Sequence, residues 1–235
     1  MSVILVTGGT GAIGSAIAAE FARTDDVIFT YNSRAEEAAR ISRELRCTAV
    51  QADVSDYASA QGAVQQVLKD FGRIDVLVNN AGVSQIKLFT DITPEDWQHV
   101  MNIDLNGVYN MTHAAVDSMI RRKSGAIVNI SSVWGVYGGA CESADSAAKD
   151  GVIGLTKALA RELGASGITV NCIAPGVIDS PMNSSHLSPE ELQELAEQTP
   201  VCRLGRPEEV AKAVRALAEN RFITGQVLGV DGGFF

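Results

Sequence analysis

The sequence predicts an α/β fold in a single domain, a doubly wound parallel sheet of about seven strands with helices on both faces. Short apolar runs rich in β-branched residues alternate with stretches of helical periodicity along all 235 residues. Runs such as Ile4–Val6 and Val76–Val78 are continuously apolar, as expected for strands that are buried on both faces. Because no Pro-, Gly- or Ser-rich linker divides residues 1–235, we expect one domain.

The expected strands are rich in Val and Ile, whereas the expected helices are rich in Ala, Glu, Leu and Arg. The strands are Val3–Val6, Val27–Tyr31, Thr48–Gln51, Ile74–Val78, Ala126–Ile130, Ile168–Ile173 and Gln226–Val230. The helices are Ala12–Arg23, Glu36–Leu45, Ala58–Phe71, Val100–Arg122, Ala147–Leu163 and Pro207–Glu219. The polar segment Asp179–Thr199 breaks the pattern, so we expect a small substrate lobe or lid there.

The composition excludes several classes of function. Lys and Arg number 19 and Asp and Glu 28, for a net charge of −9, which disfavours nucleic acid and anionic membranes as partners. No apolar run is long enough for a membrane span, and the N-terminus has no basic leader, so we expect a cytoplasmic protein. The 4 Cys and 3 His residues show no metal-ligand spacing, so no metal site is expected.

A glycine-rich turn follows the first expected strand. It comprises Thr7, Gly8, Gly9, Thr10, Gly11, Ala12, Ile13 and Gly14, and it leads directly into an expected helix. Glycines let the backbone approach a diphosphate, and the helix N-terminus offers that anion free N–H groups. The turn lacks the lysine of an ATP-binding phosphate loop. A dinucleotide site in a Rossmann fold is therefore expected.

The end of the second expected strand indicates which dinucleotide binds. An acidic residue there would hydrogen-bond the ribose 2′-hydroxyl of NAD. Here the residues are Asn32, Ser33 and Arg34, and the first acid is Glu36. Arg34 can pair with a 2′-phosphate while Asn32 and Ser33 donate to it, so NADP(H) is favoured over NAD(H).

Several further motifs occur in the order typical of the short-chain dehydrogenase/reductase family, which the chain resembles over nearly its whole length. After the glycine turn come Asp53-Val54, Asn79-Asn80-Ala81-Gly82, Ile130-Ser131-Ser132, Ser146-Ala147-Ala148-Lys149, Asn171–Gly176, Thr224-Gly225-Gln226 and Val230–Gly233. Within the family the chain is similar to bacterial 3-oxoacyl-[acyl carrier protein] reductases. Ser131–Gly135 followed by Ala140-Cys141-Glu142 is also similar to a branch that includes the elongation factor P 5-aminopentanone reductases.

The resemblance implies roles for individual positions. Gly8, Ala12 and Gly14 would frame the diphosphate turn, Asp53 and Val54 would contact adenine, Asn79, Ala81 and Gly82 would line the ribose path, and Pro175, Gly176, Ile178 and Ser180 would hold the nicotinamide end. Ala12 replaces the usual middle glycine, and Gly11 stands where NADP-preferring members often carry a basic residue. The resemblance also implies a small-molecule or carrier-bound ketone substrate and a homotetramer.

The catalytic positions depart from the family pattern. Ser132 matches the serine that steadies the carbonyl oxygen, and Lys149 matches the lysine that lowers the pKa of a proton-donating tyrosine four residues earlier. That earlier position is Asp145, and the family's asparagine position is Asp104. Because an adjacent lysine lowers the pKa of a carboxyl, we expect Asp145 to be an ionised acceptor paired with Lys149.

Three functions remain open on this reasoning. The first is an NADP(H)-dependent reductase of a 3-oxoacyl thioester or small amino ketone, impaired by the aspartate at position 145. The second is a dinucleotide-binding sensor or partner subunit without catalysis. The third is an enzyme that uses Asp145 and Lys149 for other chemistry, such as proton abstraction. Tyr137 is a weaker candidate for a substitute donor, since its spacing to Lys149 does not suit one helix face.

Overall fold

A computed structural model describes residues 1–234 and contains one parallel sheet of seven strands in the order β3-β2-β1-β4-β5-β6-β7. The strand order reverses between β1 and β4, where α/β sheets form their ligand-binding crevice. The strands are β1 (Val3–Val6), β2 (Asp26–Tyr31), β3 (Thr48–Gln51), β4 (Val76–Asn79), β5 (Gly125–Ile130), β6 (Ile168–Pro175) and β7 (Val227–Val230). The predicted doubly wound parallel sheet is thus confirmed.

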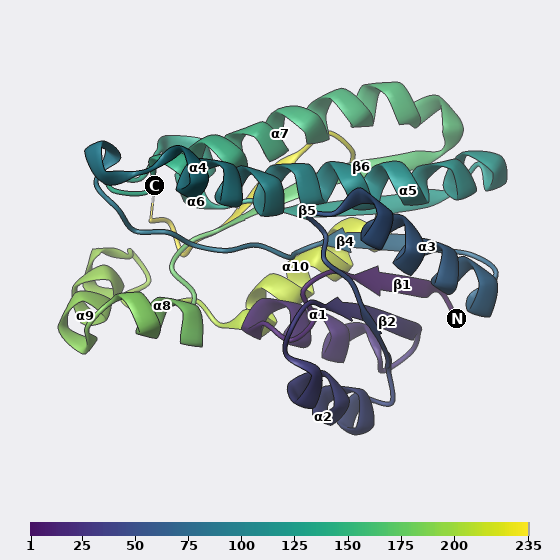
Figure 1. The fold of residues 1–235 in the computed structure, drawn as a ribbon, viewed down its shortest axis with the longest axis horizontal. Helices are drawn as coiled ribbons and strands as arrows, with labels where there is room; N and C mark the ends of the chain where they lie inside the picture. Colours follow the sequence, from purple (N-terminus) through teal and green to yellow (C-terminus); the bar gives the residue numbers. More distant parts are fainter. Residues whose placement is uncertain (235) are drawn as a thin grey trace.

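Helices cover both faces of the sheet (Figure 1). One layer holds α1 (Ala12–Phe21), α2 (Ala35–Leu45) and α10 (Pro207–Glu219), and the other holds α3 (Tyr57–Phe71), α5 (Gly107–Arg122) and α7 (Ser143–Leu163). The remaining helical segments are η1 (Phe89–Asp91), α4 (Pro94–Met101), η2 (Asn102–Asn106), α6 (Val133–Tyr137), η3 (Gly164–Ser166), α8 (Pro181–His186) and α9 (Pro189–Gln198).

Each layer has its own apolar core because successive strand residues point to opposite faces. Ile4 and Val6 of β1 pack with α1, α2 and α10, whereas Val3 and Leu5 pack with α3, α5 and α7. All four side chains are at most 3% exposed. This burial on both faces accounts for the continuously apolar strands of the sequence.

One segment differs from the sequence-based expectation, and another gains detail that the sequence did not predict. The helix predicted at Val100–Arg122 is interrupted by η2, a π-helical turn at Asn102–Asn106 that carries Asp104. A π-turn widens the helix locally and redirects side chains, which is why such turns are frequent at functional sites. The segment expected as a small lobe folds into α8 and α9, at the end of the molecule opposite the N-terminus (Figure 1).

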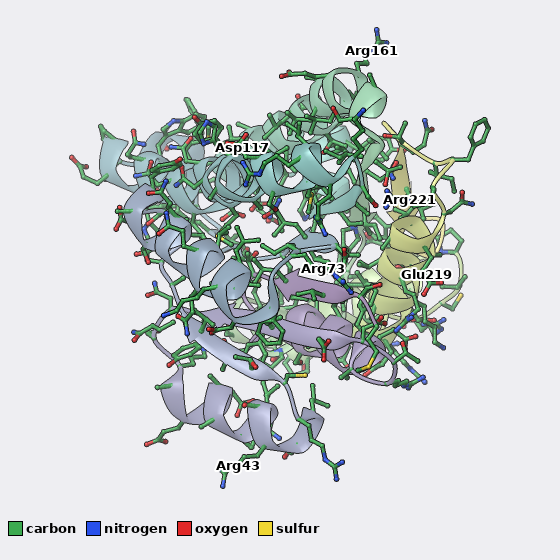
Figure 2. All side chains as sticks on the ribbon, turned by 90° about the vertical axis from the view of Figure 1, so that its right-hand side faces the viewer. Arg43, Arg73, Asp117, Arg161, Glu219 and Arg221 are labelled. Carbon is green, nitrogen blue, oxygen red and sulfur yellow. The ribbon has the colours of Figure 1, made fainter. Side chains whose placement is uncertain are left out.

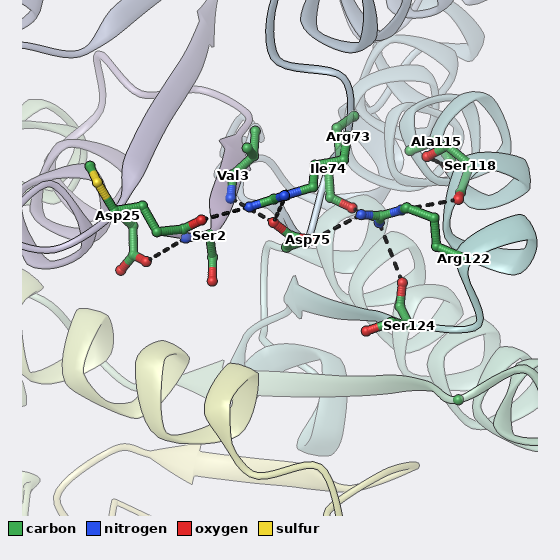
Figure 3. Close-up of polar contacts among 12 residues, drawn as sticks. Ser2, Val3, Asp25, Arg73, Ile74, Asp75, Ala115, Ser118, Arg122 and Ser124 are labelled. Carbon is green, nitrogen blue, oxygen red and sulfur yellow. Dashed lines mark hydrogen bonds and ion pairs between the residues drawn. The ribbon is translucent and has the colours of Figure 1, made fainter.

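The amino end of the sheet is held by an ionic cluster around Asp75 (Figure 3). One carboxylate oxygen of Asp75 accepts from the Val3 N–H at 2.8 Å and from Arg73 Nε at 2.8 Å, and the other accepts from Arg122 Nη1 at 2.9 Å. Arg122 also donates to the carbonyl oxygens of Ile74, Ser118 and Ser124. These contacts fasten β1, β4 and the end of α5 together.

Within residues 1–234, the structure contains no helix whose length and apolar character would suffice to cross a membrane.

Candidate active site

The glycine turn after β1 lies against the segment that follows β4. Gly8 has a positive φ of 67°, and a Cβ on it would lie 2.8 Å from Ala81 Cα. A Cβ on Gly14 would overlap the Gly8 carbonyl oxygen and would lie 2.6 Å from Asn80 Nδ2. Glycine is therefore required at both positions to keep the turn closed.

Thr7 and Asn80 hold this turn in place. The Thr7 hydroxyl oxygen accepts from the backbone N–H groups of Asn80 and Ala81, both at 2.9 Å. The Asn80 amide donates to the carbonyl oxygens of Thr7 and Gly8 at 2.9 and 3.3 Å. Neither side chain was among the predicted site residues, although both lie within the motifs that carried the prediction.

The start of α1 has the features of an anion site. Gly11 is the N-cap residue in extended backbone, and in the described chain the helix has no side-chain cap for its first N–H groups. Thr10, Gly11, Ala12 and Ile13 are partly exposed here, so a ligand can approach the first turn. The N-terminal end of a helix carries partial positive charge. The turn therefore fits the diphosphate of a dinucleotide.

The residues expected to read the adenosine ribose lie at the exposed end of β2. Asn32, Ser33 and Arg34 are exposed, and Arg34 is the N-cap residue of α2. The Asn32 carbonyl oxygen accepts from Gln51 Nε2 at 2.9 Å, which joins this turn to β3. Figure 2 shows the neighbouring Arg43 of α2 pointing away from the molecule.

Asp53 and Val54 follow β3 and are fixed by local hydrogen bonds. Asp53 Oδ1 accepts from the Ser55 N–H at 2.9 Å and from the Ser55 hydroxyl at 2.6 Å. The Val54 carbonyl oxygen accepts from Asn110 Nδ2 at 2.8 Å. Both positions are therefore rigid parts of the crevice wall.

Asn79 serves a structural contact in addition to any ribose contact. Its side chain is 2% exposed and its Nδ2 donates to Thr112 Oγ1 at 2.9 Å and to Asn129 Oδ1 at 2.8 Å. Asn129 Nδ2 in turn donates to Thr156 Oγ1 at 2.8 Å. This polar chain links β4 and β5 to α5 and α7 through Asn79 Nδ2, while Asn79 Oδ1 is buried and has no hydrogen-bond partner among the described residues.

The residues expected at the nicotinamide end follow β6. Pro175 ends the strand, and a Cβ on Gly176 would lie 2.8 Å from Asp231 Cα. Ile178 is 3% exposed and forms an isolated parallel bridge with Gly205. Ser180 is the N-cap residue of α8, where its hydroxyl accepts from the Asn183 N–H at 3.4 Å. This path therefore leads from the sheet to the α8–α9 lobe.

Ser132 and Lys149 come from two elements that meet at the end of β5. Ser132 is the N-cap residue of α6, and its hydroxyl oxygen accepts from the Trp134 N–H at 3.1 Å. The neighbouring Ser131 hydroxyl donates to the Lys149 carbonyl oxygen at 2.9 Å. Lys149 Nζ lies 3.5 Å from the Ile130 carbonyl oxygen. The serine position and the lysine position are thus tied to the same strand end.

Lys149 forms its ion pair with Asp104. The Lys149 ammonium lies 2.9 Å from Asp104 Oδ2, and Asp104 Oδ1 accepts from the Val83 N–H at 2.9 Å. Asp104 is fully buried and Lys149 is 8% exposed. Burial lowers the pKa of Lys149, but the charges of Asp104 and Asp145 outweigh it and hold that pKa above its usual range.

The expectation that Asp145 pairs with Lys149 is wrong, because the lysine pairs with Asp104. The expectation that Asp145 is ionised holds at neutral pH, which lies above its pKa of about 6. Among the described residues, no hydrogen bond or salt bridge reaches the Asp145 carboxyl, since the lysine pairs with Asp104 instead. The Asp145 side chain is 5% exposed. Burial raises the pKa of Asp145 to about 6, an effect that outweighs the lowering by Lys149. The carboxyl is therefore protonated in mildly acidic solution.

A second acid with a raised pKa lies one turn before Asp145. Glu142 is the N-cap residue of α7, and burial together with the Asp145 charge raises its pKa to about 7. The sequence analysis did not select Glu142 as a site residue. Its spacing of three residues from Asp145 was the available signal, because residues three apart share a helix face.

The segment between the glycine turn and Lys149 is continuous. Ala81 lies against Gly8, and a Cβ on the next residue, Gly82, would lie 3.0 Å from Asp104 Oδ2 and 3.1 Å from Lys149 Nζ. A single stretch of backbone therefore joins the anion site to the buried lysine. Such a crevice, at the carboxyl ends of the strands, suits an extended dinucleotide with its reactive end near Lys149.

These features define a dinucleotide-dependent oxidoreductase fold, and comparison with known proteins agrees. The family model described as "Enoyl-(Acyl carrier protein) reductase" matches residues 9–235. The chain belongs to the short-chain dehydrogenase/reductase family, whose members are oxidoreductases that use a nicotinamide dinucleotide.

Proteins similar to this chain include several 3-oxoacyl-[acyl-carrier-protein] reductases. The protein of that name, FabG, from Thermotoga maritima is 39% identical over 98% of this chain and 96% of its own length. FabG from Chlamydia trachomatis is 41% identical over 97% of this chain and 95% of its own length. The reductase from Synechocystis is 40% identical over 98% of this chain and 96% of its own length.

Proposed function

We propose that this protein is an NADP(H)-dependent reductase that converts the ketone of a carrier-bound 3-oxoacyl thioester to a secondary alcohol. The observation that carries the proposal is the unbroken contact from the glycine turn through Ala81 and Gly82 to Lys149. The names of the relatives support the carrier-bound substrate. We further propose that it acts in the cytoplasm as a homotetramer, without nucleic-acid or membrane partners.

Different residues of the chain would bind different parts of the cofactor and the substrate. Gly8, Gly14 and the first turn of α1 hold the diphosphate, and Arg34 with Asn32 and Ser33 holds the 2′-phosphate. Lys149 holds the ribose of the nicotinamide end, and Ser132 donates a hydrogen bond to the substrate carbonyl oxygen. The bound cofactor supplies a hydride to the carbonyl carbon.

The aspartate at position 145 makes a second function worth testing. A phenol there would reach the substrate oxygen, whereas the shorter Asp145 carboxyl does not reach the same point. A reductase impaired by this change, or a dinucleotide-binding sensor or partner subunit without turnover, follows from that geometry. A small amino ketone remains a further candidate substrate.

Binding and turnover measurements separate these functions. We expect NADPH to bind more tightly than NADH, as measured by quenching of tryptophan fluorescence. Gly14→Ala should weaken NADPH binding more than about tenfold, since the new Cβ overlaps the Gly8 carbonyl. Gly62→Ala in α3 is the matched control, because a Cβ on Gly62 meets no described atom within 4 Å.

Arg34→Ala tests the choice of cofactor. The loss of a charge-assisted phosphate contact should weaken NADPH binding by roughly tenfold to a hundredfold and leave NADH binding unchanged. Oxidation of NADPH by a short 3-oxoacyl thioester then tests the reaction. Tight NADPH binding with no turnover by the wild type or by Asp145→Tyr would favour the sensor function over the reductase.

A further inference from the structure

The Asp145 side chain is almost fully buried, and no described residue donates a hydrogen bond to its carboxyl, whose oxygens keep a little contact with solvent. It is 5% exposed, and the one cation nearby, Lys149, is engaged by Asp104 at 2.9 Å. A buried carboxylate that lacks a donor costs considerable free energy, whereas a protonated carboxyl avoids most of that cost and has an O–H to donate. The low exposure therefore raises the pKa of Asp145, so that the neutral acid is populated in mildly acidic solution.

The two departures from the family pattern act together. With an asparagine at position 104, Lys149 would be free to pair with Asp145 and would keep it ionised. Asp104 instead is fully buried and accepts a hydrogen bond from the Val83 N–H. It also forms the ion pair with Lys149. The acid at position 104 thus preserves the proton on the acid at position 145.

We propose that Asp145 is the proton donor of the carbonyl reduction. The inference rests on the proposed reductase function. It assigns to a carboxylic acid the step for which the family uses a phenol. The shorter reach of the carboxyl is compensated by one water molecule, through which a general acid can act.

The atoms and electrons of the step balance. The carbonyl carbon would receive a hydride, with its two electrons, from a bound reduced nicotinamide, which would be oxidised, and the C=O double bond would become a single bond. The carbonyl oxygen takes one proton from the Asp145 carboxyl through the water, which leaves a carboxylate and a secondary alcohol. Asp145 then regains its proton from solvent, with which its carboxyl oxygens keep a little contact.

The charged and titratable groups around Asp145 come from several elements. Glu142 and Lys149 lie on α7, and Asp104 lies on η2. Cys172 of β6 lies near the Lys149 ammonium, and burial raises the pKa of its thiol to about 11, so it stays neutral. From α6 the one titratable side chain is Tyr137, which is 56% exposed. α4 presents the apolar Val100 to α7.

The decisive experiment is the pH dependence of kcat/KM for NADPH-dependent reduction of a short 3-oxoacyl thioester. The assay runs from about pH 5 to about pH 8, and the acid decomposition of NADPH without enzyme is subtracted. If the reaction needs one protonated carboxyl, the rate falls about tenfold per pH unit above the pKa of that group. Asp145→Asn should remove the activity at low pH, and Asp117→Asn on the exposed side of α5 is the matched control (Figure 2).

Two further variants test the surrounding charges. Asp104→Asn frees Lys149 to pair with Asp145, so the falling limb of the pH profile should move to lower pH. Glu142→Gln removes the neighbouring negative charge, so the limb should also move to lower pH. A purely structural role for either residue would change the height of the profile without moving the limb along the pH axis.

A titration of the Asp145 carboxyl itself does not depend on turnover, so it tests the proposal even if a variant is inactive because it misfolds. Carboxyl ¹³C NMR of aspartate-labelled protein without cofactor should show one aspartate that titrates near pH 6 and is absent from Asp145→Asn. A pH-independent wild-type rate, or an Asp145→Asn variant as active as the wild type, would overturn the donor role and leave the reductase function standing. If only Asp145→Tyr is active, the donor role is likewise rejected. If no protein turns over despite tight NADPH binding, both the donor role and the reductase function are rejected.

Discussion

Asp75 and Asp145 lie at opposite ends of the same sheet and have opposite electrostatic surroundings. Asp75, before β4, accepts hydrogen bonds from a backbone N–H and two arginines (Figure 3). Burial alone would raise the pKa of Asp75, but the Val3 N–H, Arg122 and Arg73 together lower it below the usual range. At Asp145, burial raises the pKa to about 6, because the local cation is paired with Asp104.

The difference is between a carboxylate that stabilises the native state and a carboxyl whose ionisation costs stability. A carboxylate with three donors stabilises the native state. A buried carboxyl with a raised pKa destabilises the native state at neutral pH, and such groups concentrate at functional sites. The predictions below test this contrast by removing one acid or the other.

The largest expected effect is the loss of stability in Asp75→Ala. Removal of this carboxylate leaves the Arg122 guanidinium, which is 28% exposed, without its ionic partner and frees the Val3 N–H. We expect the free energy of unfolding to fall by about 3 kcal/mol, as measured by urea denaturation. Asp117→Ala, an exposed position on α5, should change it by less than about 0.5 kcal/mol. Equal effects of the two variants would show that the cluster does not stabilise the sheet.

The opposite sign is expected for Asp145→Asn near pH 8. The amide is uncharged, so it avoids the cost of an ionised carboxyl in this buried place. The pKa of Asp145 is raised by about two units, and at about 1.4 kcal/mol for each unit the unfolding free energy should rise by at most about 3 kcal/mol. Urea denaturation of both proteins at the same pH measures it. A loss of stability in Asp145→Asn would mean that the native site stabilises the ionised form.

The two acids also give opposite slopes of stability against pH. Asp145 and Glu142 have folded pKa values of about 6 and about 7, above their unfolded values, so the cost of their ionisation disappears as the pH falls through these values. The pKa of Asp75 is lowered, so its contribution is present above its unfolded pKa and is lost only in stronger acid. Stability should therefore be greatest at mildly acidic pH.

Unfolding free energies measured across this range test the assignment of the slope. Above its folded pKa value, the native Asp145 no longer contributes a slope, whereas between the folded and unfolded values it contributes on the order of 1 kcal/mol per pH unit. Asp145→Asn should reduce the slope by that amount. An unchanged slope would assign the pH dependence to the net charge of −9 instead.

The sheet and the motifs that follow its strands could be predicted from the sequence. Strands such as β1 are short, continuously apolar runs, and the glycine turn was recognised by its place between a strand and a helix. Such features depend on local pattern, so they can be inferred from neighbouring residues alone. The resemblance to the family also allowed the motifs after β3, β4, β5 and β6 to be assigned from the sequence.

The ion pairing of Asp145, Lys149 and Asp104 could not be predicted from the sequence. Spacing places Asp145 one turn before Lys149, but the partner of the lysine is decided by Asp104, which reaches it from η2. The π-turn at Asn102–Asn106 lies within a pattern that predicts a continuous helix, because a single wide turn barely alters the apolar periodicity. The burial of Asp145 is likewise a property of the packed helices α4, α6 and α7, and no local pattern encodes it.

The smallest expected effect separates the two arginines of the Asp75 cluster. Arg73 is 49% exposed and contacts Asp75 and the Met1 carbonyl oxygen, so Arg73→Ala should cost only about 0.5 kcal/mol. Arg122 is less exposed and also donates to the carbonyl oxygens of Ile74, which precedes β4, and of Ser118 in α5, so Arg122→Ala should cost more, about 2 kcal/mol. Urea denaturation of both variants at neutral pH provides the comparison. If Arg73→Ala proved as damaging as Arg122→Ala, Asp75 would act through charge alone, and the backbone contacts of Arg122 would add nothing to the stability of the amino end of the sheet.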